Sequence, residues 1–327
     1  MTIQDSNTLL AKKLRDAYSA ECNESRRIGL PSQIKFTQDG NTVKMYLQAS
    51  SLKKNMQENQ ASFEGWALAI KRWLPKEISN IELSWEQFSD VSDPHYQRFL
   101  YRIKNFQSLF NNWFKISPKN AQEIGKLKTE EEGRAFYLNV PSKPRSSKLS
   151  DQTTSLDSAM KTEHKLECFI VEHQKTLCDL LEIDKVDRQL PVGVFRDRVS
   201  SKSEHGVFTC GHSAIDIWGI NKSSKNLYLF ELKKTRNQSI GILSELFFYS
   251  YVMLDVQIGR FKFQTPNTEI EPTKFIKAYI LAPKWHPLID KSVLAMVNNA
   301  FEKSQQKIQF GAIKIENNKE PYSLSIS

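Results

Sequence analysis

The sequence predicts an α/β protein: a C-terminal α/β domain with a mixed central sheet, preceded by a separate α+β N-terminal domain. The chain has 327 residues, which is long enough for two domains that each bury a core. Residues 141–158 are rich in Ser, Thr and Pro and cannot bury enough apolar surface to offset the entropy of ordering. We therefore expect an N-terminal domain over residues 1–140, a linker over 141–159 and a C-terminal domain over 160–327.

The composition is that of an ordinary globular protein, with 39% hydrophobic and 25% charged residues. The net charge of +9 permits a polyanionic partner such as nucleic acid but does not require one. The 4 cysteines lie far apart, which favours reduced thiols over a disulfide framework or a zinc site. No apolar run is long enough to cross a bilayer, and the first residues lack the pattern of a signal peptide. We therefore expect a cytoplasmic protein without a membrane partner.

The elements of the N-terminal domain are predicted from its hydrophobic periodicity. Apolar residues at spacings of three and four predict helices, alternation predicts a strand, and two alternating runs around a turn predict a hairpin. The helices are expected over residues 7–20, 62–74 and 95–116, the hairpin over 33–47 and the strand over 81–85.

The longest amphipathic stretch, residues 95–116, has two interpretations. Its large apolar side chains follow one helical stripe, formed by Phe99, Ile103, Phe106, Phe110 and Phe114. Basic residues such as Arg98 and Arg102 lie between them, as they would on a surface that binds nucleic acid. Because the apolar residues keep to one stripe, we favour a buried stripe with a solvated opposite face.

The C-terminal domain begins with a helix and continues with a group of strands, after which helices and strands alternate. Helices are expected over residues 162–182, 240–256 and 289–302, and strands over 190–196, 207–210, 214–220, 227–232, 275–282 and 308–315. A polar loop at 221–226 predicts that the strands on either side of it form a hairpin. The strand over 275–282 follows a helix, so we expect it to join the sheet in parallel through a crossover connection.

The two strands of this hairpin each carry an acidic residue in an otherwise apolar run, Asp216 and Glu231. Burying a lone carboxylate is costly, so each acid is expected to have a partner or a metal ion. Strand pairing brings the two acids together, and alternation places Lys233 on the same face as Glu231. Carboxylate oxygens suit Mg²⁺ or Mn²⁺, which would hold and polarise a phosphodiester. Lys233 would orient the attacking water or stabilise the developing charge.

This arrangement, Asp216 followed by Glu231-Leu232-Lys233 at the end of the adjacent strand, resembles the PD-(D/E)XK nuclease superfamily. The resemblance covers residues 160–316 and implies a restriction-endonuclease-like αβββαβ core. It also implies that Asp216, Glu231 and the backbone carbonyl of Leu232 bind Mg²⁺ or Mn²⁺, and that Lys233 is the catalytic lysine. The N-terminal half of the chain has no such resemblance.

Many members of this superfamily have a further acid on the helix that precedes the first strand. Three glutamates of the predicted helix could take this role here. On a helical wheel Glu172 faces solvent, while Glu163 is the best placed and Glu167 the second best. The alternative is that these glutamates are exposed residues of an ordinary surface helix.

The helix after Lys233 carries Gln-x-x-x-Tyr in related nucleases. In this chain Tyr249 matches the tyrosine, but Glu245 stands in the position of the glutamine. The proline that gives the superfamily its name is also absent, since Ile215 directly precedes the acid. We expect Lys234, Arg236 and Tyr249 to contact nucleic acid, because basic residues after the catalytic strand can bind phosphates.

These observations predict a Mg²⁺-dependent nuclease that hydrolyses phosphodiester bonds, with DNA favoured over RNA as the partner. The resemblance implies a role in bacterial defence, restriction or repair, with a homodimer or an accessory protein as a further partner. Two alternatives stay open. One is a catalytically inactive nuclease-fold module that binds nucleic acid or a protein. The other is an unrelated α/β protein in which Asp216–Lys233 and Glu231–Lys234 are structural ion pairs.

Overall fold

The computed structural model describes residues 3–139, 155–200, 205–208, 213–234, 239–265, 267–317 and 322–326. The chain divides into two compact units. Unit 1 consists of Met1–Glu131, Ser239–Glu245 and His286–Met296, and unit 2 of Glu132–Gln238, Leu246–Trp285 and Val297–Ser327. Helices and mixed sheets occur together, which confirms the predicted α/β class. In the described part of the chain, no helix has both the length and the apolar character to cross a membrane.

Unit 1 is built on a sheet that has four strands among the described residues, in the order β1-β2-β3-β4. These are β1 (Ile34–Asp39), β2 (Thr42–Leu47), β3 (Asn80–Trp85) and β4 (Phe114–Ile116). The first two form the predicted antiparallel hairpin, and β2, β3 and β4 run parallel. The turn of the hairpin contains Gly40 with a φ of 56°, a conformation that glycine adopts without steric cost.

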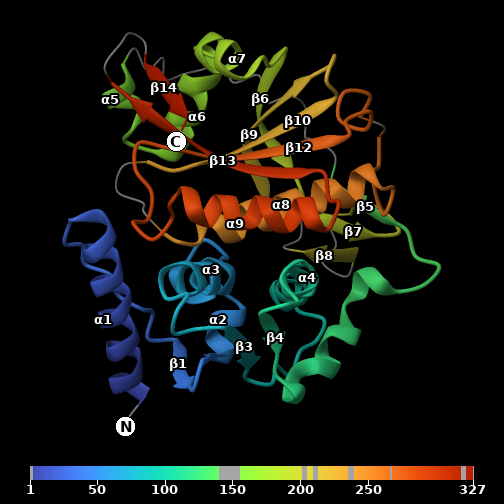
Figure 1. The fold of residues 1–327 in the computed structure, drawn as a ribbon. Coiled ribbons are helices and arrows are strands. Elements are labelled where there is room, and N and C mark those ends of the chain that lie inside the picture. The colour runs from blue at the N-terminus through green and yellow to red at the C-terminus, as the bar shows by residue number, and fades with distance from the viewer. Residues whose placement is uncertain are drawn as a thin grey trace. The chain divides into compact units, whose positions relative to one another are not determined.

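Helices connect the parallel strands of unit 1 and close its edge. Along the chain, α2 (Ala49–Leu52) and α3 (Phe63–Trp73) come between β2 and β3, and α4 (Pro94–Leu109) comes between β3 and β4. Figure 1 shows these helices next to the strands that they connect. The long helix α1 (Ile3–Cys22) lies against β1. There the Asn7 side chain donates to the Ile34 carbonyl (2.9 Å) and accepts from the Phe36 N–H (2.8 Å). The amide thereby satisfies backbone groups of the edge strand and blocks pairing with another chain.

The apolar stripe of residues 95–116 is part of the core, as the preferred interpretation predicted. Its large side chains, Phe99, Ile103, Phe106, Phe110 and Phe114, are all buried. Arg98 and Arg102 are buried too, so they do not form a basic surface. The prediction that the helix continues to Ile116 was wrong, because α4 ends at Leu109. A turn at residues 110–113 follows, which contains two asparagines of low helix propensity, and Phe114 then begins β4.

A buried ion pair joins α3 to α4. The Arg102 guanidinium donates from Nε to Oε1 of Glu64 (2.8 Å) and from a terminal nitrogen to Oε2 (2.5 Å). The same nitrogen donates to the Ala61 carbonyl (2.8 Å), and the Ser244 hydroxyl donates to Glu64 Oε2 (2.7 Å). The two charged side chains are 3% and 1% exposed. Their mutual neutralisation is therefore required for either charge to remain in the core.

Removing one member of this pair should destabilise unit 1. We expect Arg102→Met to lower the free energy of unfolding by about 3 kcal/mol or more, because the Glu64 charge stays buried without its cation. The double variant Glu64→Leu/Arg102→Met removes both charges and should recover much of the loss. Urea denaturation measures both effects. Lys104→Met, which breaks a partly exposed pair with Glu130, is the control and should cost about 1 kcal/mol or less. An equal cost for Arg102→Met and Lys104→Met would contradict the prediction.

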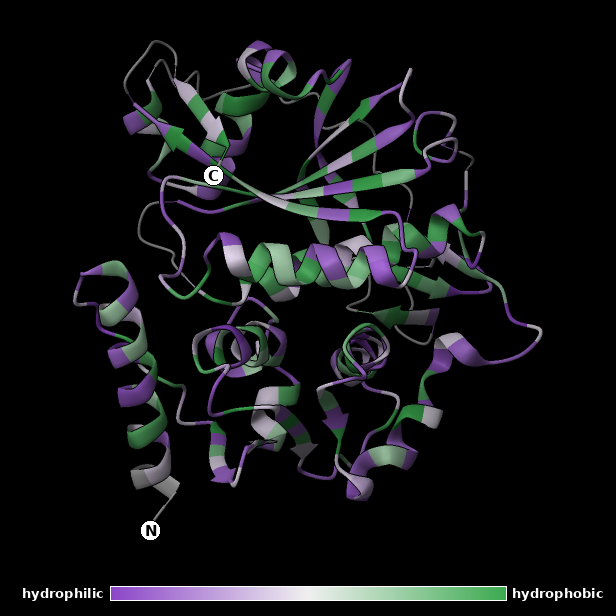
Figure 2. Ribbon diagram, viewed as in Figure 1, coloured by the Kyte–Doolittle hydropathy of each residue, from purple (hydrophilic) through white to green (hydrophobic). Residues whose placement is uncertain are grey.

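Unit 2 contains a sheet with six strands among the described residues, in the order β14-β13-β12-β10-β9-β6. The strands are β6 (Lys185–Pro191), β9 (Ala214–Asn221), β10 (Asn226–Leu232), β12 (Phe275–Ala282), β13 (Ile308–Glu316) and β14 (Ser323–Ile326). The prediction of a β9–β10 hairpin is confirmed, and so is the parallel pairing of β12 with β10. Hydrophilic and hydrophobic residues alternate along several of these strands (Figure 2).

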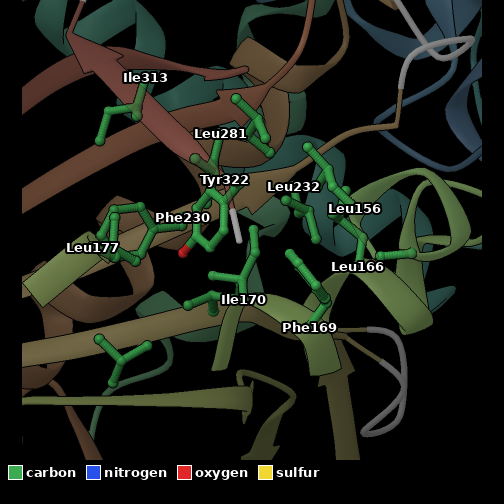
Figure 3. Packing of buried hydrophobic residues seen from close by; sticks show 14 of the residues in the cluster. Leu156, Leu166, Phe169, Ile170, Leu177, Phe230, Leu232, Leu281, Ile313 and Tyr322 are labelled. Atoms are coloured by element: carbon green, nitrogen blue, oxygen red, sulfur yellow. The ribbon is translucent and has the colours of Figure 1, made fainter. Parts of the chain in front are cut away.

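Helices cover both faces of this sheet. On one face lie α5 (Leu156–Ala159), α6 (Glu163–Glu172) and α7 (Lys175–Leu181). Their Leu166, Ile170 and Leu177 pack with Phe230 and Leu232 of the sheet (Figure 3). The opposite face is covered by parts of α8 (Ile242–Gln257) and α9 (Lys291–Lys303). There the ring centroids of Phe247 and Phe310 are 4.9 Å apart, and those of Phe301 and Phe310 are 5.4 Å apart.

Some element boundaries in unit 2 differ from the prediction. The helix expected over residues 162–182 is divided into α6 and α7 by a turn at His173 and Gln174. The strand expected over 190–196 is two strands, β6 and the short β7 (Val194–Arg196). With β5 (Phe136–Leu138), β8 (Gly206–Phe208) and β11 (Phe261–Phe263), β7 forms a second small sheet in the order β11-β5-β7-β8. In the small sheet, β5 and β11 were not predicted, and neither was β14 of the six-stranded sheet. Segments of three or four residues have no recognisable periodicity.

Candidate active site

The candidate site lies in unit 2, where β9 begins and β10 ends. The two strands are antiparallel, and their register pairs Ile217 with Phe230. Extending this register by one residue places Asp216 opposite Glu231. The hairpin thus brings the two predicted acids to the same end of neighbouring strands, as the sequence predicted.

The Glu231 carboxylate is bound by a lysine from its own strand. Glu231 Oε1 and Lys233 Nζ are 2.5 Å apart, and both side chains are buried, with exposed fractions of 3% and 4%. Since Phe230 and Leu232 belong to the core beneath α6 and α7, alternation places Glu231 and Lys233 on the opposite face of the sheet. The Lys233 N–H also donates to the Leu281 carbonyl of β12 (3.1 Å), which extends the ladder of β10 past its last residue.

The Asp216 carboxylate is fixed to the backbone at the end of β10. The Leu232 N–H donates to Asp216 Oδ2 at 3.0 Å. Asp216 is only half-buried, unlike Glu231, so solvent and solutes can reach it. The contact involves the N–H of Leu232, and the role of its carbonyl as a metal ligand stays a prediction.

A third acid, Glu167, approaches the site from α6. This helix is capped by Thr162, whose Oγ1 accepts from the Lys165 N–H (3.1 Å), and it buries Glu167 to an exposed fraction of 5%. Burial and then the negative charge of Asp216 raise the pKa of Glu167 to about 7. Hydrogen bonding to Gln189 and the positive charge of Arg188 act in the opposite direction, and the charge of Glu163 raises the pKa further. Repulsion between neighbouring carboxylates is the expected property of a site that receives a cation.

Two successive residues of β6 hold the Glu167 carboxylate. Gln189 Nε2 donates to Oε2 of Glu167 at 2.9 Å, and an Arg188 guanidinium nitrogen lies 3.6 Å from the same oxygen. That guanidinium nitrogen is also 3.3 Å from Nδ1 of His164. The role of neither β6 residue could be predicted from the sequence, because a polar pair in a strand has no distinctive spacing.

The structure favours Glu167 over Glu163 as the third acid. Glu163 is the first residue of α6 and is half-buried, whereas Glu167, one turn further on, is buried and interacts electrostatically with Asp216. The helical wheel ranked Glu163 first because it measures only the direction of a side chain around the helix axis. The burial of Glu167 depends on β6, which the wheel does not include.

The remaining predicted residues have different surroundings. Lys234 is half-buried, and its Nζ donates to the Lys161 carbonyl at 3.5 Å. Tyr249 is buried in α8, with its ring centroid 5.7 Å from that of Phe248, so its visible role is packing. Glu245 is also buried in α8. Arg236 lies outside the described residues.

The donor set suits a hard divalent cation. Among the described residues, no group of three or more His, Cys, Asp and Glu side chains is arranged to hold a metal ion. Magnesium does not require such a group, because it commonly uses one or two carboxylates and completes its shell with water and phosphate oxygens. Asp216 and Glu231 can supply these two carboxylates, provided that Glu231 exchanges the Lys233 ammonium for the ion.

The raised pKa of Glu167 predicts a pH-dependent effect on stability. An acid with a raised pKa is costly to ionise in the folded state, so the free energy of unfolding falls as pH rises from its ordinary pKa of 4.5 towards about 7. We expect Glu167→Gln, measured in EDTA, to be more stable than the wild type by about 3 kcal/mol at about pH 8 and nearly equal to it at about pH 4. The half-buried Glu163→Gln is the matched control. An effect of Glu167→Gln that is the same at both pH values would refute this assignment.

Comparisons with protein-family models, with curated proteins and with solved structures found no match to this chain. Its function therefore has to be argued from the chemistry of the site.

Proposed function

We propose that the chain is a metal-dependent nuclease that hydrolyses phosphodiester bonds, with DNA as the favoured substrate. One observation carries the proposal: Asp216, Glu231 and Lys233 lie at one end of the β9–β10 hairpin, and Glu167 is near enough for the charge of Asp216 to raise its pKa. Burying several ionisable groups together costs stability and adds no packing. Such clusters of perturbed acids are typical of functional sites.

The proposal includes a restriction-endonuclease-like core in unit 2. It is supported by the order α6, β6, β9, β10, α8 and β12, which follows the helix, three strands, helix and strand of that core. The central position of β10, between β9 and β12, supports it as well. Asp216 then lies on β9, the second strand of that core, and Glu231-Leu232-Lys233 lies at the end of β10, the third strand.

In the proposed mechanism, Asp216 and Glu231 would hold a Mg²⁺ or Mn²⁺ ion. When bound, the ion polarises the phosphodiester and lowers the pKa of the attacking water. The Leu232 N–H fixes the orientation of Asp216, which reduces the freedom lost on binding. Lys233, whose ammonium lies next to the Glu231 carboxylate, would stabilise the negative charge that develops on a phosphate bound at this end of the strands.

The substrate would approach along the basic end of the site. Lys234 follows the catalytic strand, and its ammonium reaches the carbonyl of Lys161, whose own side chain is exposed just before α6. Contacts of such lysines with phosphates add affinity without sequence preference. A role in bacterial defence, restriction or repair, and a homodimer or accessory partner, belong to the proposal through the resemblance alone, whereas a cytoplasmic location belongs to it through the composition and the first residues of the sequence.

A second function is a nuclease-fold module without catalysis that binds nucleic acid or a protein. One observation favours it: Glu231 already has a cationic partner in Lys233, at 2.5 Å. A carboxylate that is already neutralised by a lysine does not need a metal ion to remain in the core. Metal binding therefore distinguishes the two functions.

The nuclease proposal predicts metal-dependent cleavage that requires the site. We expect the wild type to cleave supercoiled, linear or single-stranded DNA, or RNA, with Mg²⁺ or Mn²⁺ but not with EDTA. Asp216→Asn and Lys233→Met should each reduce the rate about 100-fold or more, because the ion or the charge on the phosphate loses its partner. Gel electrophoresis of the products measures the rate.

Two exposed residues of α7 give matched controls for these variants. Asp179→Asn and Lys175→Met alter an ion pair with exposed fractions of 63% and 85%, and should leave the rate unchanged. Cleavage that is equal in the wild type and Asp216→Asn would reveal a contaminating nuclease and contradict the proposal. Salt-sensitive nucleic-acid binding without cleavage would favour the inactive module.

A further inference from the structure

The strand β6 departs from regular geometry directly opposite Asp216. Its register with β9 pairs Arg188 with Ile217 and Leu190 with Ile215, so the intervening Gln189 lies across from Asp216. Gln189 has a φ of 55°, in the left-handed region. This conformation is unfavourable for a residue with a Cβ atom and is uncommon for glutamine.

The left-handed residue changes where two side chains point. In a regular strand, the side chains of consecutive residues lie on opposite faces of the sheet. Here Arg188 and Gln189 both reach Oε2 of Glu167, at 3.6 Å and 2.9 Å. A regular strand could offer only one of them to that carboxylate. Strain that persists at such a position indicates a use for the arrangement.

The contacts with Glu167 are buried and specific. Arg188 and Glu167 have side-chain exposed fractions of 7% and 6%, so their charges interact in a poorly solvated environment. The Arg188 N–H donates to the Asp187 carboxylate (2.8 Å), and its guanidinium contacts His164 (3.3 Å). The first contact fixes the backbone at Arg188, and the second holds its guanidinium against α6, the helix that carries Glu167.

We propose that Arg188 and Gln189 are positioning residues that use the left-handed turn in β6 to hold the Glu167 carboxylate beside Asp216. In this role they prepare Glu167 to act with Asp216 toward a divalent cation, either directly or through a water molecule of its shell. The inference rests on the proposed metal-dependent function. It gives a positioning role to Arg188 and Gln189, which are not among the proposed catalytic residues Asp216, Glu231 and Lys233.

Gln189 allows strain and positioning to be separated. Gln189→Gly relieves the backbone strain but removes the amide, whereas Gln189→Ala removes the amide and keeps the strain. A matched control exists in Gln305, an exposed glutamine of unit 2 with a φ of 58° at the end of α9. Gln305→Gly relieves comparable strain away from the site.

The experiment measures the affinity for Mn²⁺ by calorimetry and the melting temperature in EDTA for the full chain. We expect Gln189→Gly and Gln305→Gly both to raise the melting temperature. Gln189→Gly and Gln189→Ala should both weaken Mn²⁺ binding by about tenfold, as is usual when a residue that orients a ligand is lost, whereas Gln305→Gly should leave it unchanged. Arg188→Met should weaken binding as well, and Arg188→Lys should recover part of it. Glu167→Gln is the reference variant, because it shows how much Mn²⁺ affinity is lost when the third acid itself is removed.

The outcomes separate this inference from the proposed function. If the wild type binds Mn²⁺, Asp216→Asn does not, and both Gln189 variants keep wild-type affinity, the positioning role is wrong and the metal site stands. If the Arg188 and Gln189 variants change the melting temperature but keep the wild-type affinity for Mn²⁺, these two residues have a structural role only. If the wild type binds no Mn²⁺ and cleaves no nucleic acid, the proposed function fails and the inference fails with it.

Discussion

A carboxylate in a protein interior needs a counter-charge, and this constraint governs both units. Glu64 is neutralised by Arg102 in unit 1, and Glu231 by Lys233 in unit 2. Glu167 has Arg188 near it, at 3.6 Å. The cost of separating the charges of Glu64 and Arg102, or those of Glu231 and Lys233, is large, because little solvent can replace the lost partner. The positions of α3, α4, α6 and the ends of β6 and β10 are therefore tied to electrostatic contacts as well as to apolar packing.

The Glu64–Arg102 and Glu231–Lys233 pairs differ in their surroundings. This difference separates a pair that stabilises the fold from the pair for which we propose a catalytic role. Both carboxylate oxygens of Glu64 accept hydrogen bonds from Arg102, and one also accepts from Ser244, so little acceptor capacity remains for a ligand. Glu231 and Lys233 instead lie two residues apart on one strand end, across from a half-buried Asp216. A pair formed by neighbours in sequence can open without moving an element of the fold. On the proposed function, an incoming cation would be bound here while the sheet stays intact.

Sequence patterns identified what depends on local periodicity. The β9–β10 hairpin, the parallel β12 and the shared face of Glu231 and Lys233 all follow from alternation and from the polar loop at 221–226. The choice of Glu167 over Glu163, and the contacts of Arg188 and Gln189, could not be predicted. They depend on how α6 lies against β6 and on a left-handed glutamine, and glutamine carries no signal for that conformation. The end of α4 was recognisable in principle from the asparagines that follow Leu109.

The discontinuous composition of unit 1 bears on how this protein can be dissected. Unit 1 includes Ser239–Glu245 and His286–Met296, which contain the first turns of α8 and α9. A fragment ending near residue 140 would lack Ser244, and it would also lack the Leu288 carbonyl that accepts from the Trp73 indole at 3.0 Å. A fragment beginning near residue 160 would carry these segments without the groups that they contact. The two units are thus interleaved in sequence, so neither can be expressed intact as one uninterrupted stretch of chain.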